Sequence, residues 1–380
     1  MSSEIKDRVY PCFLRNYDFN REKIMLKKNN KLLCSVGKSK SFSAVLAAVL
    51  AIAYVFSGCD SSTVENAESK ATSDEPGKLS IVTTIFPQYD FARQIAGDNA
   101  DITMLLKPGM ESHTYEPTPQ DIIDIENADI FICVGGESEE WVNDILNSLD
   151  TKDMEIINMM NIVDVVEEEI VDGMETHEEE EEDEYDEEDD TEQLYNETSD
   201  SAQEKEYDEH VWTSIDNAQV ISQAIADALC EKDEENAAYY TSNCEMYLSE
   251  LSGLKKEFNR IVKNAERDTI VFGDRFPLRY FADEFGLEYY AAFPGCAEQS
   301  EPSAGTVAFL IEKVREEDIP VVFYLELSNG KIADTIAEST DAETLQFNSC
   351  HNVTMDQFLD GVTYVDLMNE NAEALAKALN

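Results

Sequence analysis

The chain alternates short apolar runs with amphipathic helical patterns, and this alternation narrows its possible folds more than any other feature. In the first stretch the strand-like runs lie at 79–85, 101–106, 129–134 and 154–158, and the helical patterns at 87–95, 119–127 and 140–149. The run at 129–134 reads DIFICV and is apolar after its first residue. Strands without a polar face that alternate with helices are typical of βαβ units in a parallel sheet.

A second stretch shows the same alternation. Its strand-like runs lie at 269–272, 287–292, 321–325 and 344–347, and its helical patterns at 278–285, 306–316, 332–339 and in a closing region that reaches Leu379. Length agrees with this division, because 380 residues suffice for two domains of ordinary size. We therefore expect an α/β fold of two lobes, each with a parallel sheet flanked by helices.

Two helical patterns, 216–231 and 236–265, separate these stretches. The second repeats apolar residues at three- and four-residue steps from Cys244 to Ala265. At ~1.5 Å per residue it is long enough to span a small domain. The pattern alone fits either a helix that joins the lobes or a core helix of the second lobe.

Charge is strongly unbalanced. The chain has 81 acidic and 28 basic residues, a formal net charge of −53. Nucleic acid is excluded as a partner because phosphate binding requires a basic face, whereas an acidic surface attracts cations. The acidic residues concentrate at 167–208, a segment that cannot bury a core and is predicted to be a disordered loop. With only His177 in it, a solvated acidic loop is favoured over a metal-gathering one.

The first 58 residues have the pattern of a signal peptide. Lysines from Lys27 to Lys40 precede an apolar run at 42–56, which is short for a membrane span, and Ser57-Gly58-Cys59 follows. The ending resembles a bacterial lipobox, which implies that Cys59 is diacylated and becomes the mature N-terminus, with 59–78 as a tether. The alternative is an uncleaved N-terminal anchor, and translation starts at Met1 or Met25.

The stretch from Leu106 to Asp121, LKPGMESHTYEPTPQD, contains the first candidate ligand, His113. It lies in a polar loop between the end of a strand and the start of a helix. Thr118 is predicted to be the N-cap of that helix, and Pro119 suits its first position. Open α/β sheets bind ligands at the carboxyl ends of their strands, so His113 is well placed to bind one.

Two of the other three histidines occupy similar positions. His210 follows the acidic segment in Asp208-Glu209-His210-Val211-Trp212, and His351 follows the last strand-like run. Each histidine taken singly is more typical of a surface or structural residue, but the three together predict a metal site. Zinc binds neutral imidazoles and carboxylates, whereas manganese prefers more oxygen ligands.

The motif G-x-x-x-H-x-Y-E-P-T-P-x-D at 109–121 resembles the metal-site loop of zinc- and manganese-binding lipoproteins. These are the cluster A-I solute-binding components of ABC importers. The segment DEHVW around His210 is similar to the family's D-P-H-x-W, with Glu209 in place of proline, and the resemblance covers most of 78–380.

The resemblance implies a zinc receptor outside the cytoplasm that is a monomer, is anchored to the membrane through Cys59 and delivers zinc to an ABC permease. It is not an enzyme. The implied parts are an N-terminal metal-binding lobe at 79–215, a helical segment with a rigid linker helix at 216–267, and a C-terminal lobe at 268–380. Manganese is the alternative cargo.

The candidate ligands depart from the family at two positions. Zinc-binding members usually have a third histidine after the first strand of the second lobe, where this chain has Asp274. Asp274 is thus the nearest candidate ligand, although it could equally cap the next helix or pair with Arg275. Manganese-binding members place an aspartate after the last strand, and His351 lies beside that position. The resulting imidazole-rich set, His113, His210 and His351, favours zinc.

Zinc-binding relatives often have a disulfide in the second lobe, which implies a Cys296–Cys350 bridge in an exported chain. The alternative is Cys350 as a thiolate ligand of zinc. Cys133, in the middle of a strand, is predicted to be a buried thiol.

Two other classes of function stay open. A zinc hydrolase would need a general base beside a metal-bound water, but the chain has no H-E-x-x-H motif. A surface adhesion protein would bind its partner through the acidic loop while anchored by lipid.

Overall fold

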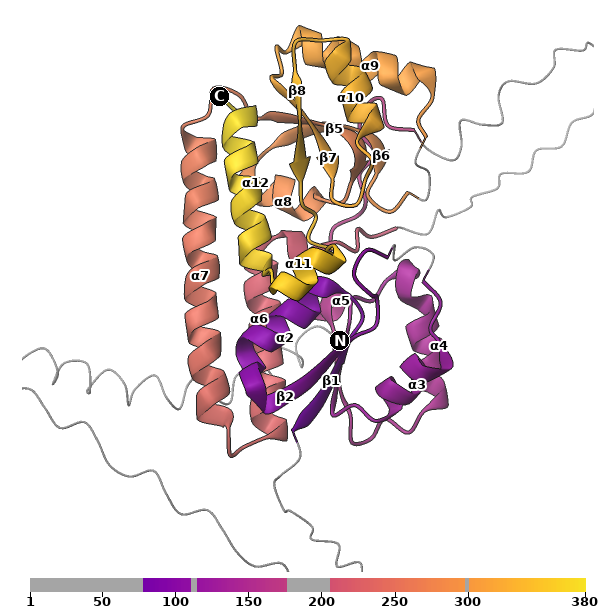
Figure 1. The fold of residues 1–380 in the computed structure, drawn as a ribbon, viewed down its shortest axis with the longest axis vertical. Coiled ribbons are helices and arrows are strands. Elements are labelled where there is room, and N and C mark those ends of the chain that lie inside the picture. The colour runs from indigo at the N-terminus through magenta and orange to yellow at the C-terminus, as the bar shows by residue number, and fades with distance from the viewer. Residues whose placement is uncertain (1–77, 111–114, 176–205, 298–300) are drawn as a thin grey trace, which may run out of the picture. The chain divides into compact units, whose positions relative to one another are not determined.

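The computed structural model describes residues 78–110, 115–175, 206–297 and 301–380. They lie in one compact unit, Lys78–Asn380. Two four-stranded parallel sheets are the centres of its two lobes (Figure 1). The predicted signal peptide, lipobox and tether up to residue 77, and also His113 and His177, lie outside the described residues.

The first lobe contains a sheet with strand order β2-β1-β3-β4. Its strands are β1 (Leu79–Thr83), β2 (Ala100–Met104), β3 (Ile130–Cys133) and β4 (Glu155–Asn158). Its helices are α2 (Phe86–Ala96), α3 (Pro119–Glu126), α4 (Glu140–Ser148) and the short α5 (Met159–Ile162). All four residues of β3 are buried, as its apolar sequence predicts.

The second lobe repeats this arrangement in the order β6-β5-β7-β8. Its strands are β5 (Thr269–Phe276), β6 (Glu288–Pro294), β7 (Val321–Leu325) and β8 (Glu343–Phe347). Its helices are α8 (Arg279–Phe285), α9 (Ala304–Glu316), α10 (Lys331–Glu338), α11 (Met355–Asp360) and α12 (Tyr364–Ala378). The predicted α/β architecture is confirmed.

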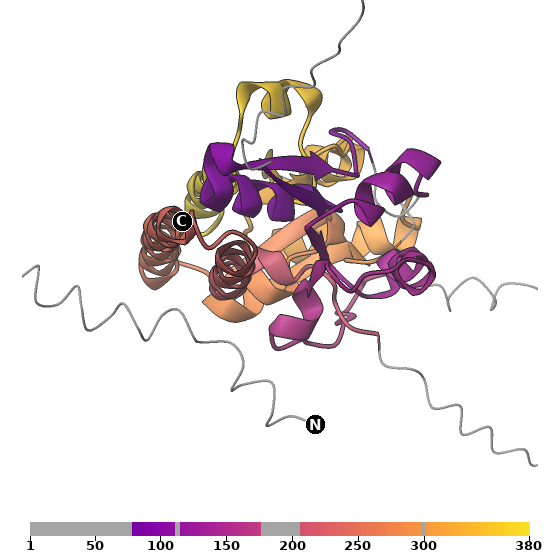
Figure 2. The same ribbon diagram turned by 90° about the horizontal axis from the view of Figure 1, so that it is seen from below.

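Two long helices connect the lobes. Helix α6 (Ile215–Lys232) is followed by α7 (Ala237–Lys263), which runs beside both sheets in Figure 1. Helix α7 contacts α2 and α6, and also α8 and α12 of the second lobe. Figure 2 shows α6, α7 and α12 grouped on one side of the sheets. The long amphipathic helix therefore joins the lobes and is not a core helix of the second lobe alone.

The C-terminal helix α12 fastens the second lobe to the first. The Tyr364 ring meets Phe91 of α2 edge to face, with centroids 5.1 Å apart. The backbone N–H of Tyr364 donates to the fully buried carboxylate of Asp90, at 2.7 Å. One hydrophobic core, which includes Phe91, Tyr247 and Tyr364, therefore continues from lobe to lobe.

The ends of the acidic segment are packed against the second lobe, contrary to the prediction of a disordered loop over all of 167–208. Glu167 and Tyr207 form an antiparallel bridge, and the N–H of Glu175 donates to the carbonyl of Ala292 at 3.1 Å. The hydroxyl of Tyr289 donates to Glu169 at 2.9 Å. These contacts give the ends of the segment partners that its composition does not reveal. Residues 176–205 lie outside the described residues.

Candidate metal centre

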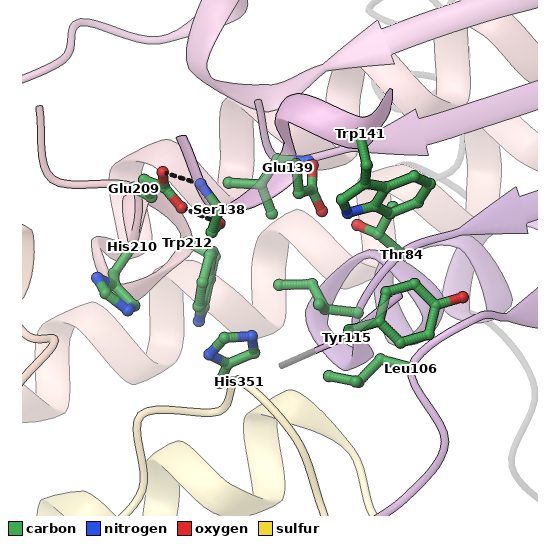
Figure 3. Close-up of a pocket in the computed structure, with 12 residues that line it drawn as sticks. Thr84, Leu106, Tyr115, Ser138, Glu139, Trp141, Glu209, His210, Trp212 and His351 are labelled. Atoms are coloured by element: carbon green, nitrogen blue, oxygen red, sulfur yellow. Dashed lines mark hydrogen bonds between the residues drawn. The ribbon is translucent and has the colours of Figure 1, made fainter. Parts of the chain in front are cut away.

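Two of the predicted ligands, His210 and His351, lie side by side. His210 is buried and precedes the short helical turn Val211–Thr213, and His351 follows β8. Their ring centroids are 6.1 Å apart, and the ring of Trp212 lies 5.3 Å from each (Figure 3). The structure thus brings together two residues that are 141 positions apart in sequence.

The His210 ring is oriented by Asp208. Oδ1 of Asp208 accepts a hydrogen bond from the His210 backbone N–H at 2.7 Å and lies 3.1 Å from Nδ1. Burial of the ring opposes protonation, but the carboxylates of Asp208, Glu209 and Glu168 together raise the pKa of His210. A histidine that donates its Nδ1–H to a carboxylate presents Nε2 as a lone-pair donor, which is the usual arrangement of a metal-binding histidine.

Glu209, which replaces the family's proline, ties this segment to the loop after β3. Its carboxylate accepts hydrogen bonds from the backbone N–H of Ser138, at 2.9 Å, and from the Ser138 hydroxyl (Figure 3). Gly136 makes the approach feasible, because a Cβ there would lie 2.5 Å from Oε1 of Glu209. The backbone φ of Gly136 is +100°, a value that L side chains rarely adopt.

His351 is held by the carboxylate of Glu326, at the end of β7. Oε1 of Glu326 accepts from the His351 backbone N–H at 3.2 Å, and Oε2 accepts from the Ser349 N–H at 2.6 Å. Between these residues Cys350 has a φ of +60°, a strained conformation for a residue with a side chain. The sequence reasoning missed Glu326, although its position at the carboxyl end of a buried strand was a usable signal.

The turn that contains His351 also bonds to the first lobe. The carbonyl of His351 accepts from the N–H of Phe86 at 3.4 Å, and the Asn352 amide donates to the carbonyl of Met110 at 2.8 Å. The N–H of Gly109 donates to the carbonyl of Val353 at 2.8 Å. His351 is therefore fixed where the two lobes meet.

His210 and His351 line two small recesses, of about 30 Å³ and 40 Å³. Each has room for about one water molecule or ion. The first is also lined by Glu139 and the second by Glu326. The buried Glu139 accepts from the N–H groups of Val134 and Gly135, at 2.7 and 3.0 Å. Burial raises the pKa of its carboxyl to about 7. The sequence reasoning did not single out Glu139.

Comparison with known proteins shows which family the chain belongs to. A family model described as zinc-uptake complex component A, periplasmic, matches residues 81–378. The chain belongs to this zinc-uptake family. It is a family of solute-binding receptors and not a class of enzymes. Among the described residues, no helix has the length and apolarity that crossing a membrane requires.

Individual relatives agree with the family assignment. The high-affinity zinc uptake system protein ZnuA of Bacillus subtilis is 30% identical over 315 residues, which are 83% of this chain and 92% of that protein. The zinc-binding lipoprotein AdcA of Streptococcus pneumoniae is 28% identical over 299 residues. These cover 79% of this chain but 55% of AdcA, so this chain spans about half of that protein.

Solved structures share the two-lobed fold. The metal-dependent lipoprotein YcdH from Bacillus subtilis has a TM-score of 0.63 at 27% identity, covering 80% of this chain and 100% of that one. The Zn(II)-bound ZnuA-like domain of Streptococcus pneumoniae AdcA has a TM-score of 0.62 at 26% identity, covering 80% and 99%.

The loop by which this chain resembles the zinc-uptake family lies partly outside the described residues, and His113 with it. The described residues beside that gap, Met110 and Tyr115, line the second and the first recess respectively. Thr118 is the N-cap of α3, as predicted, and accepts from the N–H of Asp121 at 3.3 Å. His113 as a ligand stays a prediction.

Asp274 is not among the residues that line the two histidine recesses. Its carboxylate accepts from the N–H groups of Arg275, at 2.9 Å, and Leu325, at 3.2 Å. It lines a neighbouring cavity of about 440 Å³ together with Lys331. The role of Asp274 as a zinc ligand also stays a prediction.

The predicted Cys296–Cys350 disulfide is wrong. Both residues are free thiols in the structure, as are Cys133, Cys230 and Cys244. Cys350 is buried in the core, where burial raises the pKa of its thiol well above the usual value, and it lines neither recess. Cys296 is partly exposed beside Glu168, whose carboxylate accepts from its backbone N–H at 2.8 Å. The burial of Cys133 is as predicted.

Proposed function

We propose that the chain is the extracytoplasmic receptor of a zinc ABC importer, which captures Zn²⁺ between its two lobes and delivers it to a membrane permease. The observation that carries this proposal is the pair His210 and His351, whose rings lie 6.1 Å apart where the lobes meet. Membership of the zinc-uptake family supports it.

The proposed ligands are His113, His210, His351 and Asp274. Three imidazoles and a carboxylate fit the tetrahedral coordination of zinc, and manganese prefers a set with more oxygen. Glu139 and Glu326 already line the histidine recesses, so they are the carboxylates against which Asp274 has to be tested.

Zinc binding requires the imidazoles in their neutral form, so uptake of the ion displaces protons from protonated rings. The Asp208 carboxylate holds the His210 ring at a fixed angle, 3.1 Å from Nδ1, which lowers the ordering cost of binding. The net charge of −53 raises the local concentration of cations at the surface. Docking on the permease would then release the ion.

The remaining assignments follow from the sequence. Residues 1–58 serve as the signal peptide, and a lipid on Cys59 anchors a monomeric receptor through the 59–78 tether. The lobes are 79–215 and 268–380, joined by 216–267. The relative AdcA is itself named a lipoprotein, which supports the anchor.

The alternatives have weaker support. A manganese-bound protein of candidatus Liberibacter asiaticus and the laminin-binding proteins of streptococci are 21–23% identical to this chain, which shows a shared fold alone. A hydrolase has no support from the family, and we propose that the chain has no catalytic activity.

The test is native mass spectrometry of Lys78–Asn380, with zinc and manganese offered together. We expect one tightly held zinc. His210→Ala and His351→Ala should each weaken it at least 100-fold, about 2.8 kcal/mol, because each removes a ligand. His177→Ala is the matched control, since it removes the histidine of the acidic segment, and it should leave this zinc in place.

Two results would change the assignment. Tight zinc that survives His351→Ala would make His351 a structural residue and move the site toward Asp274. The absence of any tightly bound metal in the wild type would overturn the receptor proposal.

A further inference from the structure

A second group of metal-ligating side chains lies outside the histidine recesses. Carboxylate oxygens of Glu168 and Glu206 and the sulfur of Cys296 all lie within 4.8 Å of one another. Glu168 and Glu206 stand at the two ends of the acidic segment, and Cys296 follows β6 in the second lobe. This group therefore joins three separate parts of the chain and combines oxygen with sulfur.

The backbone that holds these side chains is fixed by hydrogen bonds of its own. The N–H of Glu168 donates to the carbonyl of Glu206 at 3.0 Å, beside the bridge between Glu167 and Tyr207. The N–H of Cys296 donates to Oε1 of Glu168 at 2.8 Å. These hydrogen bonds hold the backbone of the three residues together and place the Glu168 carboxylate beside Cys296.

Charge around the thiol also favours a cation. Burial is the main cause of the raised pKa of Cys296, and the carboxylates of Glu168, Asp208 and Glu209 raise it further. A divalent cation would reverse this balance by offsetting the negative charges around the sulfur. Because Zn²⁺ and Cd²⁺ accept thiolate together with carboxylate, whereas Ca²⁺ and Mg²⁺ take oxygen alone, the ligand types select the first pair.

The group lies next to the histidine centre. Cys296 follows Gly295, where an added Cβ would lie 3.4 Å from Cε1 of His210. Glu206 lies two residues before Asp208, and Asp208 orients the His210 ring. An ion at this group would be held where the acidic segment reaches the second lobe, one residue along the chain from Gly295, which contacts the His210 ring.

We propose that Glu168, Glu206 and Cys296 form a second Zn²⁺ or Cd²⁺ site, weaker than the histidine centre. On binding, the thiol of Cys296 releases its proton to water and the thiolate coordinates the ion. If this site hands its ion on to the histidine centre, that role rests on the proposed receptor function. The ability of the site to bind metal does not rest on it.

Cadmium titration of Lys78–Asn380 tests the proposal, because a thiolate bound to cadmium gives an ultraviolet charge-transfer band that imidazole and carboxylate ligands do not give. We expect a second equivalent of Cd²⁺ that produces this band. Cys296→Ser should remove the band and leave the first equivalent bound. Cys230→Ser, which changes a buried thiol away from the site, should keep both.

A milder variant guards against misfolding. Glu168→Gln keeps the thiol and should weaken the second equivalent at least tenfold with the band still visible at saturation. Zinc should also slow alkylation of Cys296, which is the most exposed of the five described cysteines.

Three outcomes would overturn the proposal: no charge-transfer band in the wild type, a band that persists in Cys296→Ser, or no effect of Glu168→Gln. The receptor proposal is tested separately: it expects His210→Ala to weaken the first equivalent and to leave the band, and it fails alone if the first equivalent is unchanged in this variant.

Discussion

The two lobes have the same strand order but place different groups at the ends of equivalent strands. The second strand of the first lobe leads to the loop of His113, and that of the second lobe leads to Cys296. The fourth strand of the first lobe ends at Asn158, which caps α5, whereas β8 leads to His351. The shared topology fixes where metal-ligating side chains can lie, and the sequence of each lobe decides which strand ends have them.

The third strands make the contrast sharpest, because each is followed by a carboxylate with a different task. Glu139, after β3, bonds the N–H groups of its own loop, Val134 and Gly135, and lines the first recess. Glu326, after β7, bonds the N–H groups of Ser349 and His351, in the loop after the neighbouring strand. One carboxylate organises its own loop, and the other positions a proposed ligand.

Burial raises the pKa of both carboxyl groups, and the largest effect that we predict is the pH dependence of stability in Glu139→Gln. The folded-state pKa of Glu139 is about 7, above its ordinary value of 4.5. The folded state therefore holds this proton more tightly, and stability is lost as the pH rises from about 4.5 through 7. The full loss is on the order of 3 kcal/mol, and glutamine, which stays neutral, avoids it.

Urea unfolding of the metal-free protein between pH 4 and 8 measures this effect. The free energy of unfolding of Glu139→Gln, minus that of the wild type, should increase with pH and level off above 7. A difference that is constant across this range would show that the folded protein ionises Glu139 at little cost in free energy, which contradicts the raised pKa.

A smaller effect on zinc affinity is expected from changes to the carboxylates that hold the two histidines. Asp208→Asn should weaken zinc binding 10- to 100-fold, because the variant loses the charge that orients and polarises the His210 ring. Glu326→Gln should weaken it about tenfold, since its amide keeps one acceptor for the backbone of the His351 turn. Competition with a fluorescent chelator measures both.

Asp366→Asn is the control for this pair, because Asp366 belongs to the N-terminal cap of α12 and lies outside the recesses. If Asp208→Asn binds zinc as tightly as the wild type, the Asp208 contact is structural and His210 is not a ligand oriented by it.

The sequence predicted the lobes and most of their elements because burial imposes a period on the chain. The short run DIFICV favoured a buried strand, and the three- and four-residue steps from Cys244 onward favoured a long helix. His210 and His351 could be grouped in advance because His210 lies in a segment similar to the family's D-P-H-x-W and His351 follows the last strand-like run. The roles of Glu209 and Glu326 could not be predicted, because no pattern in the sequence indicates that their carboxylates bond Ser138 and Ser349.

The disulfide failed for a related reason. Cys296 follows β6 and Cys350 follows β8, which are the two outermost strands of the sheet, so the two turns start at opposite edges, and sequence position does not reveal this strand order. In the structure Cys350 points into the core and Cys296 lies at the edge, beside Glu168. Side-chain direction in an irregular turn depends on backbone angles such as the φ of +60° at Cys350, and no periodic pattern encodes them.

The smallest expected effects come from substituting two glycines, Gly136 in the loop after β3 and Gly253 in helix α7. Gly136 has a φ of +100° and faces Glu209, whereas Gly253 lies in the middle of α7 with nothing within 4 Å of an added Cβ. Gly136→Ala should lower the free energy of unfolding by about 1 to 2 kcal/mol and weaken zinc binding, because the new methyl group displaces the Glu209 carboxylate. Gly253→Ala should raise the free energy of unfolding by about 0.5 to 1 kcal/mol without changing zinc affinity, because alanine restricts the unfolded chain and favours the helix.

Urea unfolding and zinc competition on both variants separate the two cases. Equal shifts for the two would mean that the loop after β3 tolerates a side chain, and that the bond between Ser138 and Glu209 does not hold His210 in place.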